Sequence, residues 1–211
     1  LKVVVTNWDQ DPLELDVPHH PGRPEFGSRV IPFGRELYID RSDFEPEPPE
    51  AFFRLVPGGS VRLKYGFIVD YEGMTKDADG RVTEVYVRYD PKTRSRQDQS
   101  GRKVKGTIHW VHEESAKEVD VRMYDRLFSV TDPGSYDDPV PLINPDSLIT
   151  GKALVEPVLG ALMPDTYFQF ERVGFFKQDP ESRDGHIIYN RSVTLKDAWN
   201  KKKSHCRRRG S

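Results

Sequence analysis

The chain has 211 residues, which allows one large domain or two small ones, each able to bury a core without a metal or disulfide. Its single cysteine, Cys206, has no partner inside the chain, which argues against a disulfide-stabilised secreted fold. No apolar run approaches the roughly 20 residues that cross a bilayer, and the chain opens without a charged-then-apolar leader. We therefore expect a cytoplasmic protein with no membrane partner.

The formal net charge of −2 combines two different populations. A basic run occupies the end of the chain, with Lys201, Lys202, Lys203, Arg207, Arg208 and Arg209, and no acidic residue follows Asp197. The rest of the chain is therefore more acidic than the net charge indicates, and it repels a polyanion at long range. We expect residues 201–211 to form a disordered basic tail, and any RNA contact to come from local clusters.

Short runs in which apolar and polar residues alternate predict a mainly β protein. In chain order the predicted strands are residues 2–6, 36–39, 61–71, 83–89, 104–111, 119–124, 165–176 and 187–195. The turn residues Asp77 to Gly80 separate two of these alternating runs and predict a long hairpin, because Gly80 can take a positive φ. Helix is expected to be scarce, with short pieces only at 113–118 and 156–162.

The number of short strands and the length of the chain predict two β-barrels or sandwiches in succession. Proline-rich joints at 46–49 and 133–141 interrupt the series, because a central strand cannot run through them. We place the boundary near Gly106, which gives a first region of 1–105 and a second of 106–200. With this division, a strand from one region can still pair within the sheet of the other.

No enzyme signature occurs in the sequence. His19-His20 and His109-x-x-His112 resemble metal ligands, but zinc needs about four converging ligands, and structural or surface histidine is the better interpretation. The sequence has no glycine-rich phosphate loop, nucleophile elbow or recognisable carboxylate pair. We therefore predict neither a catalytic residue nor a metal site.

Basic residues on or beside the predicted strands are the first candidates for a binding site. Arg62 and Lys64 share the polar face of one strand, and Arg54 lies between an aromatic pair and a glycine turn. A further cluster follows a polar loop and consists of Arg102, Lys103 and Lys105. Guanidinium groups fit base edges and phosphates, and unpaired bases are recognised in this way on β platforms. The alternative is a solvated strand face.

A second candidate site lies in the run from Tyr167 to Arg172. Gln169 and Glu171 have the same parity and should face together, whereas Arg172 has the parity of the core-facing positions. Either the strand ends or bulges before Gly174, or Arg172 reaches from a cleft towards a carboxylate or base. An ordinary salt bridge at a strand end is the other interpretation.

Several motifs, in register over roughly residues 1–200, closely resemble the C-terminal half of glutaminyl-tRNA synthetases. They are residues 101–111, 124–128, 168–172, 174–176 and 190–199. The resemblance implies two consecutive six-stranded β-barrels, proximal and distal, which hold the three anticodon bases of glutamine tRNA. By position, Arg54 resembles the arginine that reads the third base, a guanine. Phe53 stands where the family has a basic residue.

The same resemblance implies roles for the other candidates. Arg62 and Lys64 resemble a basic pair that serves the first anticodon base. Gln169 and Arg172 resemble the pair that holds the central uracil, with Glu171 ordering them. The remaining expected tRNA contacts are Arg102, Lys103, Lys105 and Lys196.

The resemblance also implies what lies elsewhere. In the family, an upstream catalytic domain binds ATP, Mg²⁺ and glutamine, so this chain is expected to contain no cofactor and to recognise the anticodon stem-loop as a monomer. Because Leu1 is no initiator and a strand-like run follows at once, we expect a fragment of a glutamine–tRNA ligase. The alternatives are the related part of an archaeal or eukaryotic type glutamyl-tRNA synthetase, or a β-barrel module that binds protein rather than RNA.

Overall fold

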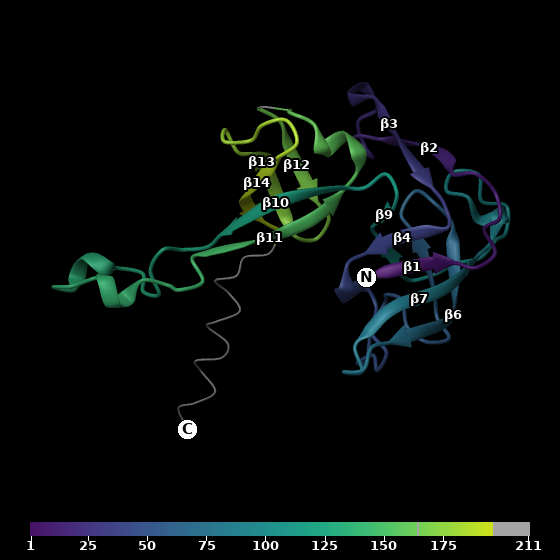
Figure 1. Ribbon diagram of the computed structural model, residues 1–211, viewed down its shortest axis with the longest axis horizontal. Coiled ribbons are helices and arrows are strands. Elements are labelled where there is room, and N and C mark those ends of the chain that lie inside the picture. The colour runs from purple at the N-terminus through teal and green to yellow at the C-terminus, as the bar shows by residue number, and fades with distance from the viewer. Residues whose placement is uncertain (164, 196–211) are drawn as a thin grey trace. The chain divides into compact units, whose positions relative to one another are not determined.

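The computed structural model describes residues 1–163 and 165–195, and it divides the chain into two compact units, Leu1–Ala116 and a second that begins at Lys117. Both units consist of β-strands joined by loops and short 3₁₀ helices (Figure 1). The prediction of a mainly β fold with little helix is confirmed. Within the described residues, no helix is both long and apolar enough to cross a membrane.

The first unit is built on a seven-stranded sheet in the order β8-β5-β6-β7-β1-β4-β9. Its strands are β1 (Lys2–Val5), β4 (Glu36–Ile39), β5 (Ser60–Leu63), β6 (Ile68–Lys76), β7 (Val82–Tyr89), β8 (Thr107–Ile108) and β9 (Trp110–His112). The two edge strands β8 and β9 are separated in the chain by only His109. The sheet must therefore curl until its edges approach, which gives a nearly closed barrel.

The core of the first unit follows from the alternation of the strands. Val3 and Val5 of β1 are buried beside Val85 and Val87 of the parallel strand β7. A two-stranded sheet of β2 (Leu13–Pro18) and β3 (Ser28–Phe33) adds further apolar side chains to the same core. Phe33 is fully buried, and its ring meets those of Trp8, Phe67 and Trp110 at centroid distances of 5.0–5.2 Å.

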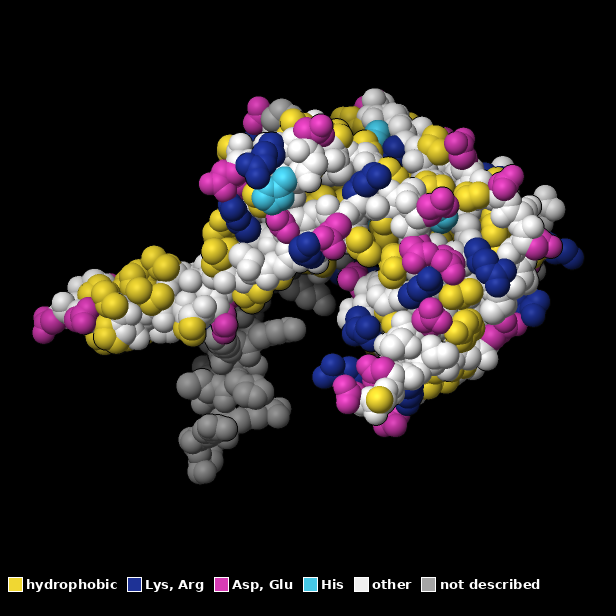
Figure 2. Space-filling model, in the orientation of Figure 1, with side chains coloured by type: hydrophobic (Ala, Val, Ile, Leu, Met, Phe, Trp, Pro, Cys, Tyr) yellow, Lys and Arg dark blue, Asp and Glu magenta, His cyan; other side chains and the backbone are white. Residues whose placement is uncertain are grey.

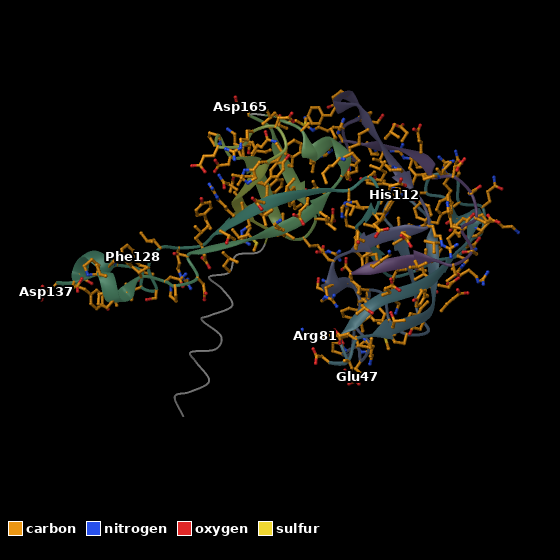
Figure 3. All side chains as sticks on the ribbon, in the orientation of Figure 1. Glu47, Arg81, His112, Phe128, Asp137 and Asp165 are labelled. Atoms are coloured by element: carbon orange, nitrogen blue, oxygen red, sulfur yellow. The ribbon has the colours of Figure 1, made fainter. Side chains whose placement is uncertain are left out.

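The second unit has a five-stranded sheet in the order β11-β10-β14-β13-β12. Its strands are β10 (Lys117–Tyr124), β11 (Leu148–Val155), β12 (Tyr167–Phe170), β13 (Gly174–Gln178) and β14 (Ile188–Thr194). Tyr189 is fully buried in the core, and its hydroxyl donates a hydrogen bond to the Leu159 carbonyl at 2.9 Å. The segment that joins β10 to β11 extends away from the sheet and carries Phe128 and Asp137 (Figure 3).

All the helical pieces of the described residues are 3₁₀ helices. They are η1 (Pro24–Phe26), η2 (Arg41–Asp43), η3 (Pro91–Thr93), η4 (Pro133–Ser135), η5 (Val140–Leu142) and η6 (Pro157–Gly160). Proline opens or nearly opens five of them, because its fixed φ suits the first helical position and its missing N–H costs nothing there. η6 lies inside the predicted helical piece at 156–162, whereas residues 113–115 form a turn and β10 begins at Lys117.

The predicted single strand at 61–71 is wrong, because the chain turns after β5 and returns as β6. Tyr65 has a φ of 64°, and Gly66 donates to the Leu63 carbonyl at 2.8 Å, so a tight turn divides the apolar run. The predicted strand at 165–176 is divided in the same way, into the hairpin of β12 and β13. The predicted hairpin of β6 and β7 is confirmed, with a φ of 79° at Gly80 in its turn.

The units divide later in the chain than the predicted boundary near Gly106. Strand β8 pairs with β5 and strand β9 with β4, so residues 107–112 complete the sheet of the first unit. The predicted boundary places residues 107–112 in the second region. The two main sheets have seven and five strands, where the resemblance implies six in each barrel. The predicted tail at 201–211 lies outside the described residues.

Candidate nucleic-acid interface

A pocket of about 420 Å³ in the first unit brings together two of the predicted basic clusters. One wall comes from Phe52, Phe53 and Arg54, and the other from the segment 102–106. The two walls approach closely at Gly106, where an added Cβ would lie 2.0 Å from the Phe53 carbonyl oxygen. Arg54 and the cluster at 102–105, separated by about fifty positions in the sequence, therefore share one site.

Arg54 is held in place at the pocket. Its Nη1 donates to the Ser42 carbonyl at 2.6 Å, and its Nε lies 3.4 Å from Oδ1 of the buried Asp43. The guanidinium also lies 5.7 Å from the centre of the Phe52 ring. These contacts fix the direction of the guanidinium, while 34% of the side chain stays exposed. An orientation fixed in advance lowers the entropy cost of binding a ligand.

Two lysines and an exposed aromatic ring complete the pocket. Phe53 is 53% exposed, and the Lys105 ammonium lies 5.2 Å from the centre of its ring. Lys103 is also exposed on the same segment. An exposed ring beside cations is a typical surface for stacking an unpaired base next to its phosphate.

Arg102 has a different environment from the two lysines that follow it. Its guanidinium forms ion pairs with Asp70 at 2.5 Å and with Asp90 at 3.1 Å. These carboxylates raise the pKa of Arg102, and in turn the hydrogen bond from Arg102 is the main reason that the pKa of Asp70 is lowered. Arg102 therefore anchors the segment that carries Lys103 and Lys105.

Arg62 and Lys64 lie apart from this pocket. Arg62 donates from Nη1 to the Thr93 carbonyl and from Nη2 to Asp98, both at 2.6 Å. Hydrogen bonds from Ser100 are the main cause of the lowered pKa of Asp98, and the bond from Arg62 contributes further. Lys64 follows β5, and its ammonium lies 5.5 Å from the centre of the Tyr65 ring.

The second unit presents a mixed aromatic and polar face on β12 and β13. Gln169 is exposed and pairs across the sheet with Phe175, which is 38% exposed. Tyr167 lies on the same face of β12 and is 61% exposed, with the Lys177 ammonium 5.5 Å from its ring. Phe170 packs on the opposite face in the core. Exposed rings beside an amide suit an unpaired base.

Glu171 and Arg172 lie in the turn between β12 and β13. The φ of Arg172 is 61°, and the Val173 amide donates to the Phe170 carbonyl at 3.0 Å. The strand therefore ends before Gly174, as one of the two alternatives predicted. The expectation that Gln169 and Glu171 share a strand face is wrong, because β12 ends at Phe170. Lys196 lies outside the described residues.

His112 shows the structural role expected for the histidines. It is buried in β9, and its Nδ1 lies 3.2 Å from Ser115 Oγ. Burial lowers the pKa of His112. Among residues 1–163 and 165–195, no group of three or more potential metal ligands comes together.

Sequence reasoning missed the exposed aromatic residues of both units. The missed residues are Phe53, Tyr167 and Phe175. The strand pattern carried a usable signal for Tyr167, which has the parity of Gln169 and so belongs on the polar face, but not for Phe175, which stands next to Phe176. Phe53 stands next to a second phenylalanine, and such a pair at a loop cannot show which ring is exposed.

The basic side chains do not form one continuous positive patch on the face shown in Figure 2. On the face shown in Figure 2, lysines and arginines alternate with acidic residues over both units. Such a distribution on this face favours recognition by a few placed groups over binding through bulk charge.

The fold and the candidate site define a pair of β units that present fixed cations and exposed rings. Residues 1–90 match a family model described as "tRNA synthetases class I (E and Q), anti-codon binding domain", and residues 107–179 match a second model with the same description. The two matched segments together span well over half of the chain. The chain therefore belongs to the anticodon-binding domains of class I tRNA synthetases of the E and Q group.

The similar proteins are glutamine–tRNA ligases. The chain is 51% identical to the glutamine–tRNA ligase of Rhodopirellula baltica over 205 residues, which is 95% of this chain and 34% of that protein. The identity is 44% to the glutamine–tRNA ligases of Serratia proteamaculans and Yersinia pestis, over 95% and 94% of the chain and 36% of each protein. The chain thus spans about a third of the length of these curated relatives, and the predicted resemblance to glutaminyl-tRNA synthetases is confirmed.

Proposed function

We propose that the chain is the anticodon-binding part of a glutamine–tRNA ligase and recognises the three anticodon bases of glutamine tRNA. The observation that carries this proposal is the pocket in which the oriented Arg54 meets Phe53, Lys103 and Lys105. The larger protein would then attach glutamine to its tRNA with ATP and Mg²⁺ bound by an upstream domain. We further propose that the chain is monomeric, acts in the cytoplasm and holds no cofactor itself.

Arg54 is the residue that we assign to the third anticodon base. The guanidinium fork can donate two parallel hydrogen bonds to O6 and N7 of a guanine, and the contacts to Ser42 and Asp43 hold it in one direction. The base would stack on Phe53, while Lys103 and Lys105 neutralise its phosphates. Arg102 contributes by positioning these two lysines through its ion pairs with Asp70 and Asp90.

Other residues serve the remaining bases. We assign Arg62 and Lys64 to the first base, next to the loop that holds Asp98. We assign Gln169 to the central uracil, supported by its exposed position between two aromatic residues, with Glu171 and Arg172 at the adjacent turn. Lys196 completes the set of proposed tRNA contacts.

The proposal is tested by titrating the chain with two glutamine anticodon stem-loops that differ only in the third anticodon base. We expect the stem-loop with guanine to bind more tightly, by about 1 to 3 kcal/mol at fixed salt. Equal affinity for both would refute the glutamine assignment. Preference for the third base of a glutamate anticodon would identify the glutamyl enzyme, and no RNA binding would favour a protein-binding module.

Replacing Tyr167 with alanine should weaken binding of the stem-loop by about 1 to 3 kcal/mol, because a base stacked on the exposed ring loses its platform. Fluorescence anisotropy with a labelled stem-loop measures this change. Tyr136→Ala is a matched control, since Tyr136 is 51% exposed on the segment between β10 and β11. If both variants bind as the wild type does, the β12–β13 face has no part in recognition.

A further inference from the structure

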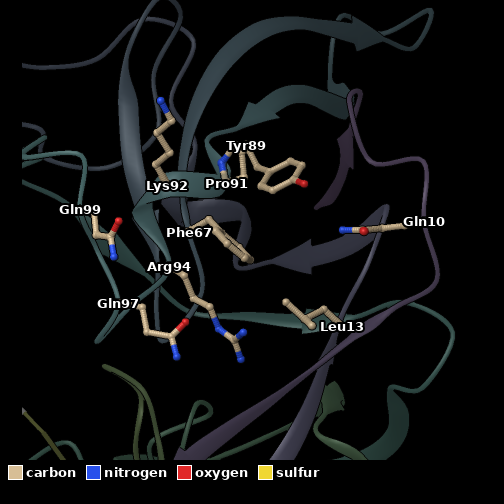
Figure 4. A pocket seen from close by; sticks show the side chains of 9 residues that line it. All are labelled: Gln10, Leu13, Phe67, Tyr89, Pro91, Lys92, Arg94, Gln97 and Gln99. Atoms are coloured by element: carbon tan, nitrogen blue, oxygen red, sulfur yellow. The ribbon is translucent and has the colours of Figure 1, made fainter.

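A second pocket of the first unit has a volume of about 540 Å³ and no place in the function proposed above. Its floor is aromatic, with Phe67 and Tyr89, and its rim is polar, with Lys92, Arg94, Gln97 and Gln99 (Figure 4). The volume is in the range of small-ligand sites, which is about 300 to 1,000 Å³. Lys92 lies in η3, and the other three rim residues lie in the loop that follows it.

Among the described residues, the two cations of the rim have no acidic partner. Asp90 is bonded to Arg102 at 3.1 Å, and Asp98 is bonded to Arg62 at 2.6 Å. The carboxylates of this loop are therefore directed at other arginines. Within the described parts of the chain, the side chains of Lys92 and Arg94 form no hydrogen bond or ion pair. An unpaired guanidinium at a concave site suits an anionic ligand.

The backbone that carries these side chains is held by hydrogen bonds. Thr93 is fully buried, and its hydroxyl donates to the Asp90 carbonyl at 2.6 Å and accepts from the Ile68 amide at 2.8 Å. The Ser95 amide donates to the Gly66 carbonyl at 2.9 Å, and the Gln99 amide donates to the Lys92 carbonyl at 3.1 Å. The rim is thus formed before a ligand arrives, which reduces the entropy lost on binding.

The floor and the amides suit a nucleobase. The rings of Phe67 and Tyr89 lie 5.1 Å apart, and both belong to the aromatic core of the first unit. In Figure 4 the side chains of Arg94 and Gln97 extend in the same direction. A glutamine amide donates and accepts at once, so it can pair with a base edge, while a guanidinium holds the neighbouring phosphate.

We propose that this pocket binds a fourth nucleotide of the RNA, an unpaired one next to the first anticodon base. Arg94 holds its phosphate, Gln97 pairs with its base edge, and Tyr89 borders the base. The position follows from Arg62, which we assigned to the first base and which is bonded to Thr93 and Asp98 of the same loop. The inference therefore rests on the proposed function.

The test uses the 211-residue chain and a labelled glutamine anticodon stem-loop, with Arg94→Gln and Gln97→Ala as variants. We expect each variant to weaken binding on the order of tenfold, equally for stem-loops with either third anticodon base, because hydrogen bonds to this nucleotide are lost. Arg96→Gln is the matched control, because Arg96 lies in the same loop, loses the same charge and does not line the pocket. We expect it to change the affinity less than about threefold.

The nucleotide is located by an abasic replacement next to the first anticodon base. This RNA should bind the wild type more weakly, but the replacement should cause no further loss in Gln97→Ala, because the two changes remove one interaction. Wild-type affinity in Arg94→Gln and Gln97→Ala, or equal losses in Arg94→Gln and Arg96→Gln, overturns the inference. If only Arg54→Ala weakens RNA binding, the inference about this pocket is overturned and the proposed function stands. If the wild type does not bind the stem-loop, both are overturned.

Discussion

Gly106→Ala is expected to destabilise the first unit by about 2 to 4 kcal/mol and to abolish most of the binding of the stem-loop. The added Cβ would lie 2.0 Å from the Phe53 carbonyl oxygen and 3.3 Å from Val61 Cγ1. Neither segment can move freely, because Gly106 accepts a hydrogen bond from the Arg62 amide at 3.0 Å and Leu55 is fully buried. The clash therefore separates the two walls of the Arg54 pocket.

Urea unfolding and anisotropy titration measure the two effects of this substitution. Gly134→Ala is the control, because its Cβ would meet only Asp132 Oδ1, at an ordinary contact distance of 3.6 Å. We expect this control to stay within about 0.5 kcal/mol of the wild type. If Gly106→Ala unfolds at the wild-type urea concentration and binds RNA normally, the close approach of the two walls is not required for the site.

The strands that the sequence predicted best are those that bury one face. β4 has the predicted bounds, and the β6–β7 hairpin turns at the predicted glycine, because alternation and turn chemistry agree there. β11 escaped prediction because most of its residues are exposed on both faces, so it has no apolar alternation. β2 was missed although Leu13, Leu15 and Val17 alternate with polar residues, so the sequence did carry a signal for it. β3 contains Pro32, which a central strand would not accept but the isolated two-stranded sheet accommodates.

The sequence predicted which types of residue form the candidate site, but not which carboxylates form ion pairs with its arginines. The sequence identified Arg62 and Arg102 as cations on strands or loops, yet it gave no sign that carboxylates distant in the chain bind them. Asp98 lies 36 positions from Arg62, and Asp70 lies 32 positions from Arg102. Such pairs depend on how loops return to the sheet, which local periodicity does not encode. The sequence left open whether the strand ended before Gly174 or continued through Arg172, because the positive φ of a non-glycine residue cannot be recognised from the sequence.

Arg54→Ala is expected to remove discrimination at the third anticodon base, at a cost of about 1 to 3 kcal/mol in binding of the matching stem-loop. The affinity for the stem-loop with a changed third base should fall little, because Arg54 of the wild type makes no matched contact with that base. The affinities of the two RNAs therefore converge in the variant. Arg54→Lys should behave similarly, since a lysine keeps the charge but lacks the planar fork that pairs with a guanine edge.

The control for this prediction is Arg88→Ala, which removes one exposed arginine of the first unit from its pair with Glu72, away from the pocket. Both variants lose one positive charge, so long-range attraction to RNA falls equally in the two, and any difference between them comes from the base contact. Titrations of both RNAs at two salt concentrations separate the contributions, because phosphate contacts weaken with salt more than base contacts do. An equal loss for both RNAs in Arg54→Ala would show that Arg54 holds a phosphate, and the reading of the third base would then have to come from another residue of the pocket.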